Sequence, residues 1–333
     1  MGKARRRTVC VCLMVWLAVF AGLVSPASAE TGLKKARLMP LWSPQAQFAG
    51  YYMALEKGIY ARHGIDLTIL TGGPGRSAIQ SLTNGEADFA VLWLSTALQQ
   101  HDAGLKLVNL AQIVPRSSLL LVVRTASGIR TPKDLQGKKI GVWDGELSLP
   151  ILAFLDRYHL QVRRIPQAYT VNLFLRGGLD AASAMWYNEY HTMLNAGINP
   201  EELRVFSLHE HGITFPEDGL YALEHRYRQD PALAKAFARA SLEGWRYAFA
   251  APEETLDVTL RIMRQAKVPA SRSHQRWMLE RMRDLMAPAS DGEPPGRLQP
   301  SGYQAAAAIL RDHGVIKDVP DYETFMGGAD VRR

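Results

Sequence analysis

The chain has 333 residues, enough for about two domains at the usual ~100–200 residues each. Its hydrophobic fraction of 47% and charged fraction of 21% are typical of a globular protein with a sizeable core. The formal net charge of +7 falls to +3 without residues 1–29, which hold four cations and no acidic residue, so the charge gives no reason to expect a nucleic-acid partner.

The N-terminal segment has the three parts of a secretory signal peptide. Lys3 and three arginines precede an unbroken apolar run at residues 9–24, and Ala27-x-Ala29 follows as a small-residue cleavage site. We predict a signal peptide at residues 1–29 and a periplasmic location for the remainder. The alternative is a retained membrane anchor, but the run of 16 residues is shorter than the roughly 20 that span a bilayer.

Both cysteines of the chain, Cys10 and Cys12, lie in this N-terminal segment. After cleavage the chain would have no disulfide, no thiol nucleophile and no cysteine-bound metal. No later stretch of the sequence is apolar enough to predict a membrane span.

The first half of the exported chain alternates short apolar runs with amphipathic segments. We expect strands at 36–40, 66–70, 87–93 and 105–114, and helices at 45–63, 76–84 and 95–102. Strands that alternate with helices at these spacings predict a mainly parallel sheet covered on both faces, which is an α/β fold.

The same pattern starts again after residues 119–124 and predicts a second α/β lobe. We expect strands at 138–143, 168–171 and 181–186, and a helix at 149–158. After Pro231 the chain becomes helical, with helices expected at 232–250, 253–267, 274–286 and 303–314 and a loop at 288–300. Two such lobes with a helical C-terminal segment are typical of a binder that closes on a small ligand, although two-domain exported enzymes share the outline.

One candidate binding element is the glycine turn that begins with Gly72 and Gly73, between a predicted strand and a predicted helix. Its backbone N–H groups could hold a polar group of a ligand. The alternative is a tight turn with no ligand. The turn lacks the Gly-Lys-Ser/Thr of a Walker loop and does not match the dinucleotide-binding fingerprint.

The most unusual run of the sequence follows the predicted strand at 181–186. It contains Trp186, Tyr187, Asn188 and Glu189, and ligands bind at strand ends in open α/β sheets. Aromatic faces can stack on a planar heterocycle while a carboxylate accepts from its amino group. We interpret the run as part of a ligand site; the alternative is an edge segment whose rings belong to the core.

Three further tryptophans, Trp42, Trp93 and Trp143, fall at or just beyond predicted strand ends. Four tryptophans in this position, with Trp186, indicate a lined pocket. The side chains expected to complete it near these tryptophans are Gln47, Phe48, Ser95 and Glu146.

No catalytic or metal-binding motif accompanies these residues. His209 and His211 would share a face on a strand, but no third ligand is evident nearby, and metal sites usually need three or four. The esterase Gly-x-Ser-x-Gly elbow and the His-Glu-x-x-His zinc helix do not occur. We therefore predict no metal, no cofactor and no enzymatic activity.

Several segments resemble the thiamine-pyrimidine-precursor group of ABC-transporter substrate-binding proteins. They are WSPQAQFAGYYMA at 42–54, GIY at 58–60, GIDL at 64–67, GEADF at 85–89 and LQGKKIGV at 135–142. The similarity extends from about Leu38 to Ala222. Binders of sulfonates, nitrate and riboflavin share several of these motifs.

The resemblance implies a type II periplasmic-binding-protein fold with two hinge crossings, placed near 121–124 and 220–224. The first lobe would then comprise 34–122 and 223–333, and the second 123–222. It also implies that the chain captures a small-molecule ligand and delivers it to an inner-membrane ABC permease. Separately, we expect a monomer. Trp42 and Glu189 match the positions that hold the aminopyrimidine in relatives.

The chain departs from the family pattern at Gln47-Phe48, where relatives often carry Asn-His. That histidine is a key residue of the related fungal pyrimidine synthase, whose cysteine-rich motif is also missing, so both absences argue against a synthase. The leading hypothesis is a binder of a planar heterocycle such as a thiamine-precursor pyrimidine. The alternatives are a riboflavin or sulfonate binder, a sensory input protein, and an enzyme of the same fold.

Overall fold

The computed structural model describes residues 32–287 and 295–327, and Leu33–Arg333 form one compact unit. The predicted signal peptide and most of the predicted loop at 288–300 lie outside the described residues. Among the residues that are described, no helix is both long and apolar enough to cross a membrane.

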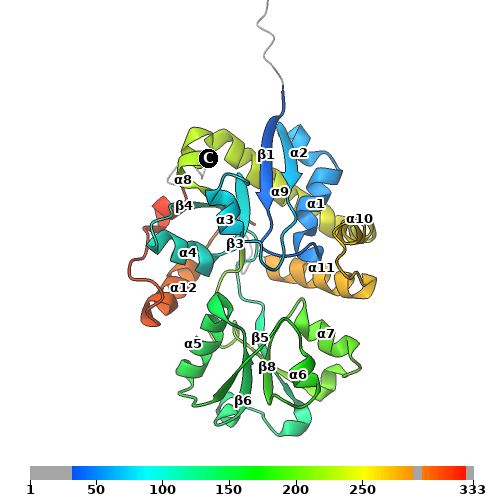
Figure 1. The fold of residues 1–333 in the computed structure, drawn as a ribbon, viewed down its shortest axis with the longest axis vertical. Helices are drawn as coiled ribbons and strands as arrows, with labels where there is room; N and C mark the ends of the chain where they lie inside the picture. The colour runs from blue at the N-terminus through cyan, green and yellow to red at the C-terminus, as the bar shows by residue number, and fades with distance from the viewer. Residues whose placement is uncertain (1–31, 288–294, 328–333) are drawn as a thin grey trace, which may run out of the picture. The chain divides into compact units, whose positions relative to one another are not determined.

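The first lobe is built on a five-stranded sheet in the order β2-β1-β3-β10-β4 (Figure 1). β1 runs parallel to β2 and β3, whereas β10 runs antiparallel to β3 and β4. The central strands β3 and β10 are buried along their whole length, because helices cover both faces of the sheet. The strands are β1 (Lys34–Met39), β2 (Ile65–Ile69), β3 (Phe89–Trp93), β4 (Leu107–Gln112) and β10 (Asp218–Leu223).

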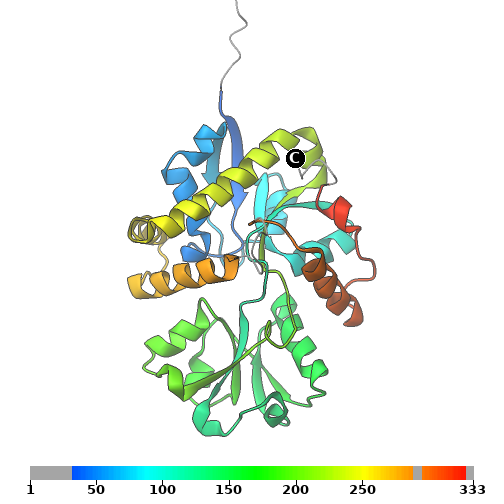
Figure 2. The ribbon, with the colours of Figure 1, turned by 180° about the vertical axis from the view of Figure 1, so that it is seen from behind.

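The helices of this lobe come from both ends of the chain. α1 packs closely on α9 (Figure 2). A Cβ on Gly244 would lie 2.2 Å from the Gly50 carbonyl oxygen, and one on Gly50 would lie 2.3 Å from the Trp245 ring. Glycine at both positions allows this approach. The helices are α1 (Ala49–Glu56), α2 (Ile59–Arg62), α3 (Ala78–Thr83), α4 (Leu94–Asp102), α8 (Glu224–Gln229), α9 (Pro231–Ala250), α10 (Pro252–Gln265), α11 (Arg272–Met286), α12 (Pro300–Asp312) and α13 (Tyr322–Phe325).

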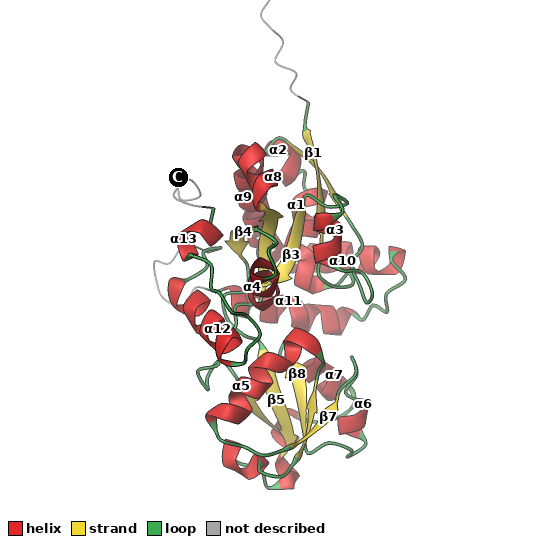
Figure 3. Ribbon diagram, turned by 60° about the vertical axis from the view of Figure 1, so that its left-hand side comes forward, coloured by secondary structure: helices red, strands yellow, loops and turns green. Residues whose placement is uncertain are grey.

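The second lobe repeats this plan with the strand order β7-β6-β8-β5-β9, and helices again lie on both sides of the sheet (Figure 3). β6 is parallel to β7 and β8, and β5 is antiparallel to β8 and β9. The strands are β5 (Leu119–Arg124), β6 (Lys139–Val142), β7 (Arg163–Pro166), β8 (Ala181–Met185) and β9 (Leu203–Ser207), and the helices are α5 (Leu149–Arg157), α6 (Asn172–Leu175) and α7 (Glu189–Asn195).

The two-lobed α/β fold is as predicted, but three local predictions are wrong. Both sheets are mixed rather than mainly parallel, because β10 and β5 enter them in the opposite direction. The helix expected at 45–63 is divided at Gly58, whose left-handed φ of 62° separates α1 from α2. Residues 168–171 are not a strand, and β7 lies earlier in the chain.

The chain passes between the two sheets at 113–118 and 208–217. The sequence placed these crossings near 121–124 and 220–224; in the structure those residues belong mainly to β5 and β10. Glu217 joins the two crossings, because its carboxylate accepts from the Ser118 N–H at 2.6 Å and the Ser118 hydroxyl at 2.8 Å. The lobe boundaries predicted from the sequence, 34–122 with 223–333 and 123–222, stay a prediction.

Candidate functional site

A cavity of about 430 Å³ lies between the two lobes, at the carboxyl ends of β1, β3, β6 and β8. Carboxyl ends of strands are the usual ligand-binding edge of an open α/β sheet. The first lobe contributes Leu41, Trp42, Gln45, Gln47, Arg76, Ser77, Ala78, Ile79, Leu92, Trp93 and Thr96, and the second contributes Trp143, Asp144, Gly145, Leu147, Tyr169, Met185, Tyr187, Asn188 and Glu189.

Aromatic side chains from both lobes form the walls of this cavity. Trp42 of the first lobe meets Tyr169 of the second edge to face, with ring centroids 5.0 Å apart and an interplanar angle of 60°. Trp143 and Tyr187 are buried on the second-lobe side, and the Trp143 indole N–H donates to the Ala168 carbonyl at 3.3 Å. Rings in this arrangement can hold a flat, largely apolar ligand.

A buried hydrogen-bond group forms the first-lobe floor. Asp218, which is 2% exposed, accepts from the Trp93 indole N–H at 3.1 Å and from Nε2 of Gln47 at 2.8 Å. The other amide atom of Gln47, Oε1, accepts from Nε2 of Gln45 at 2.6 Å. Burial raises the pKa of Asp218 to about 7 although these donors favour its charge. The polar groups of the floor are thus bound to one another.

Glu189 is the carboxylate of the second-lobe wall and the first residue of α7. Its Oε2 accepts from the Met185 N–H at 2.9 Å, and its Oε1 accepts from Nδ2 of Asn188 at 2.7 Å. Removal from bulk water raises the pKa of Glu189 to about 7. Each carboxylate oxygen has two lone pairs and accepts one of these bonds, so each can accept a further hydrogen bond from a ligand.

The structure brings together seven of the thirteen residues that the sequence singled out. Those that line the cavity are Trp42, Gln47, Trp93, Trp143, Tyr187, Asn188 and Glu189. Phe48 and Ser95 are instead buried in the first lobe, next to lining residues. The side chain of Glu146, in the short 3-10 helix Gly145–Ser148, is outside what the structure describes.

The glycine turn and Trp186 do not line the cavity either. Gly72 lets its loop pass close to the segment after β1, since a Cβ there would lie 2.4 Å from the Trp42 carbonyl oxygen. Gly73 lies in the same loop, and this supports the reading of the segment as a tight turn. Trp186 is half-buried and faces α11, where the Arg281 guanidinium lies 4.9 Å from its ring centroid.

Among the residues of the site that were not singled out from the sequence, three matter most for its chemistry. Arg76 follows the glycine turn and brings a cation to the cavity wall. Tyr169 lay in a segment expected to be a strand, and Asp218 reaches Trp93 only because β10 pairs with β3, 125 residues away in the chain. No local sequence pattern identifies Asp218 as a site residue. Predicting β10 as a strand of the first sheet would have been the only way to find it from the sequence.

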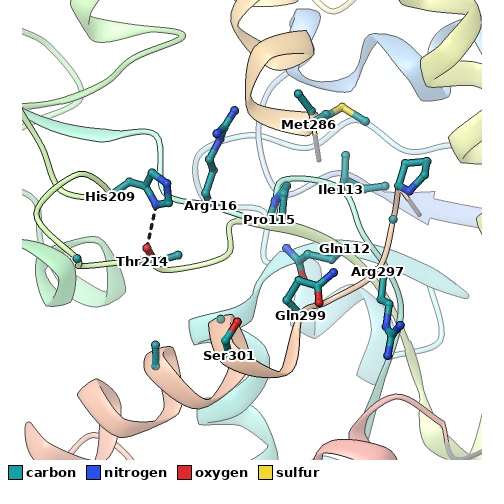
Figure 4. A pocket seen from close by; sticks show the side chains of 16 residues that line it. Gln112, Ile113, Pro115, Arg116, His209, Thr214, Met286, Arg297, Gln299 and Ser301 are labelled. Carbon is teal, nitrogen blue, oxygen red and sulfur yellow. Dashed lines mark hydrogen bonds between the residues drawn. The ribbon is translucent and has the colours of Figure 1, made fainter. Parts of the chain in front are cut away.

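The two histidines considered as a metal pair have separate partners. Nδ1 of His209 lies 2.9 Å from the Thr214 hydroxyl, and Nδ1 of His211 lies 2.6 Å from the Tyr158 hydroxyl. His209 belongs to the wall of a second cavity, about 350 Å³, beside the crossing segments (Figure 4). Within the described part of the chain, no group of three or more His, Cys, Asp or Glu side chains is placed to hold a metal ion.

Comparison with known proteins adds a family and a fold. A family model described as NMT1/THI5 like matches residues 45–255. The chain is 25% identical to the formylaminopyrimidine-binding protein of Halalkalibacterium halodurans, over 73% of this chain and 75% of that protein. It is 27% identical to the riboflavin-binding protein RibY of Chloroflexus aurantiacus, over 93% of this chain and 91% of that protein.

Among solved structures, the periplasmic sulfonate-binding protein SsuA of Methylobacillus flagellatus is similar with a TM-score of 0.65 and 15% identity. The match covers 88% of this chain and 91% of that one. This likeness shows the periplasmic-binding-protein fold expected from the sequence.

Proposed function

Because this chain belongs to the NMT1/THI5-like family, we propose that it is the solute-binding component of an ABC importer and that its ligand is a small planar heterocycle. The membership agrees with the resemblance found in the sequence. The observation that carries the ligand class is Glu189, a desolvated carboxylate in the wall of a cavity that aromatic side chains of both lobes also line.

An aminopyrimidine related to thiamine precursors fits this arrangement. Its flat ring would lie against Trp42 and Tyr169, and its amino group would donate to the acceptor capacity left on Glu189. The two curated relatives are named for a pyrimidine and for riboflavin, which are both planar nitrogen heterocycles. Riboflavin is therefore the second candidate ligand, and a sulfonate the third because a solved structure of this fold is named for it.

The proposal extends to location and partners. The exported chain after residue 29 would act as a monomer in the periplasm and present its ligand to an inner-membrane permease. The curated relatives are named as binding proteins, which supports a binding role for this cavity.

Native mass spectrometry of residues 30–333, purified without added ligand, tests the proposal. We expect a non-covalent adduct that is lost on denaturation and has the mass of a pyrimidine. Calorimetric titration with formylaminopyrimidine, riboflavin and an alkanesulfonate then ranks the three candidates on the same protein.

The outcomes are separable. A flavin or sulfonate mass would replace the ligand but keep the binding role. An adduct that survives denaturation, or turnover of a titrated ligand, would contradict a pure binder. Failure to bind any of the three would overturn the proposed ligand class.

A further inference from the structure

The unusual aromatic run after β8 divides between two faces. Tyr187, Asn188 and Glu189 line the cavity, whereas Trp186 and His191 pack on α11 of the first lobe. The Trp277 indole N–H donates to the Trp186 carbonyl at 2.9 Å, and the Trp277 ring stacks on His191 at 4.9 Å with an interplanar angle of 14°. The second face therefore joins the two lobes.

α11 is firmly part of the first lobe at this point. Oε1 of Gln275 accepts from the Ala46 N–H at 2.7 Å, at the start of the short helix that also carries Gln47. His274 precedes Gln275 and reaches across to α7. A contact of His274 is therefore a contact between lobes.

A continuous set of hydrogen bonds links the cavity to this contact. Nδ2 of Asn188 donates to Oε1 of Glu189 at 2.7 Å, and Oδ1 of Asn188 lies 2.9 Å from Nε2 of His274. Nδ1 of His274 lies 3.0 Å from Nδ1 of His191. One amide thus contacts both the cavity carboxylate and a histidine of the opposite lobe.

The proton positions follow from the carboxylate. An ionised Glu189 can only accept, so the amide nitrogen of Asn188 must face it and the amide oxygen must face His274. Nε2 of His274 therefore carries the proton, and its Nδ1 is an acceptor. His191 must then donate from Nδ1. The amide nitrogen of Asn195 lies 3.1 Å from that same Nδ1 and cannot accept from it, so this tautomer requires the Asn195 amide to be turned with its oxygen toward His191.

We propose that Asn188, His191 and His274 form a closure latch that couples ligand contact at Glu189 to contact between the lobes. This inference deepens the proposed function and rests on it for the ligand. A donor on the ligand holds Glu189 ionised and oriented, and Glu189 in turn orients Asn188 toward His274. His274 is a positioning residue: it lies outside the cavity lining, yet it favours the closed form that binds ligand.

Acid should open the latch. Protonation of both histidines would place two N–H donors and two charges face to face at 3.0 Å. Burial lowers the pKa of His191 and lowers that of His274 to about 4, so the closed form disfavours the charged rings. The latch therefore stabilises the closed form fully above the ordinary histidine pKa, and this stabilisation is lost as the pH falls below that pKa.

The other groups around the pair modify this effect. Glu280 on α11 opposes the lowering of the His191 pKa, and Asn195 on α7 contacts Nδ1 of His191 at 3.1 Å. Arg281 lies over the Trp186 and Trp277 rings.

The test combines a rescue pair with a distance measurement. His274→Ala removes the donor to Asn188, whereas His274→Gln keeps an amide donor near the position of Nε2. Ser273→Ala, on the exposed neighbour of His274, is the matched control. Because the chain after residue 29 has no cysteine, spin labels at Arg264→Cys on α10 and Arg176→Cys beside α6 would report the separation of the lobes.

We expect His274→Ala to weaken binding of formylaminopyrimidine about tenfold at pH 8 and to lengthen the label distance with or without ligand. His274→Gln and Ser273→Ala should stay close to the parent in both readouts. When the pH is lowered from 8 to 5, the parent should lose more affinity than His274→Gln. The affinity that His274→Gln still loses reflects protonation of Glu189.

An unchanged label distance and affinity in a folded His274→Ala protein, checked by circular dichroism, would overturn the latch and leave the proposed function standing. If the parent binds none of the candidate ligands, the proposed ligand fails. The latch is then still decided by the label distance measured without ligand, because the contacts of His274 with Asn188 and His191 are made between protein side chains.

Discussion

The two walls of the interlobe cavity are built differently. On the first-lobe wall, Asp218, Gln47 and the Trp93 indole N–H are hydrogen-bonded to one another, and Arg76 is the charged side chain of the lining. On the second-lobe wall, Glu189 keeps acceptor capacity although it is also held by its own chain. The difference indicates that, Arg76 apart, the first lobe supplies mainly shape and the second supplies polar recognition.

The largest expected effect concerns folding and the buried carboxyls of the hinge and floor. Burial raises the pKa of Asp218 to about 7 and that of Glu217 to about 8, with the neighbouring Asp218 charge adding to the latter. The folded chain then holds protons that the unfolded chain has released, so stability should fall as the pH rises from 5 to 8. We expect a loss on the order of 2 kcal/mol per carboxyl, measured by urea denaturation at both pH values.

Variants of these two carboxyls sharpen the result. Asp218→Asn and Glu217→Gln should each flatten the stability profile, and Asp218→Asn should change ligand affinity little. A parent protein equally stable at pH 5 and pH 8 would show that these groups do not hold protons in the fold.

The second expected effect is on binding. Glu189→Gln keeps the shape of the side chain but removes its charge, so a charge-assisted bond to the ligand should be lost. We expect binding to weaken by about 1.5–3 kcal/mol, or roughly tenfold to a hundredfold, in calorimetric titration at pH 8. Equal affinity of parent and variant would remove Glu189 from ligand recognition and leave the second wall without its distinguishing feature.

Much of this contrast could be predicted from the sequence, because it depends on where parallel strands end. Trp42, Trp93 and Trp143 follow or end strands that share one edge of each sheet, so they meet at the cavity. Which side chain of a following helix faces the cavity was harder to predict. On α4 the neighbouring residue Thr96 lines the cavity, whereas the predicted Ser95 does not.

The floor could not be predicted in this way. Asp218 belongs to a strand that returns after the whole second lobe and pairs antiparallel to β3, which no local pattern announces. The α11 partners of Trp186 and His191 are likewise 91 and 83 residues away in the chain. Both features are set by packing between distant segments.

A third prediction separates the walls through Gln47. Gln47→Ala leaves Asp218 with one donor fewer and the Gln45 amide without its acceptor, so we expect a loss of about 1–2 kcal/mol in the free energy of unfolding. Affinity should change by less than about threefold, because the Gln47 amide is already used within the protein. A large loss of affinity with unchanged stability would assign Gln47 to the ligand and make the two walls alike.

The smallest expected effect is at the rim, where Tyr169 is 66% exposed and meets Trp42 across the lobes. Tyr169→Ala should weaken binding by about 0.5–1.5 kcal/mol, or roughly twofold to tenfold, because an edge-to-face ring contact is lost. Tyr169→Phe keeps the ring and should bind like the parent, which excludes a role for the hydroxyl. If Tyr169→Ala cost more affinity than Glu189→Gln, ring contacts rather than the carboxylate would dominate, and the second lobe would also act mainly by shape.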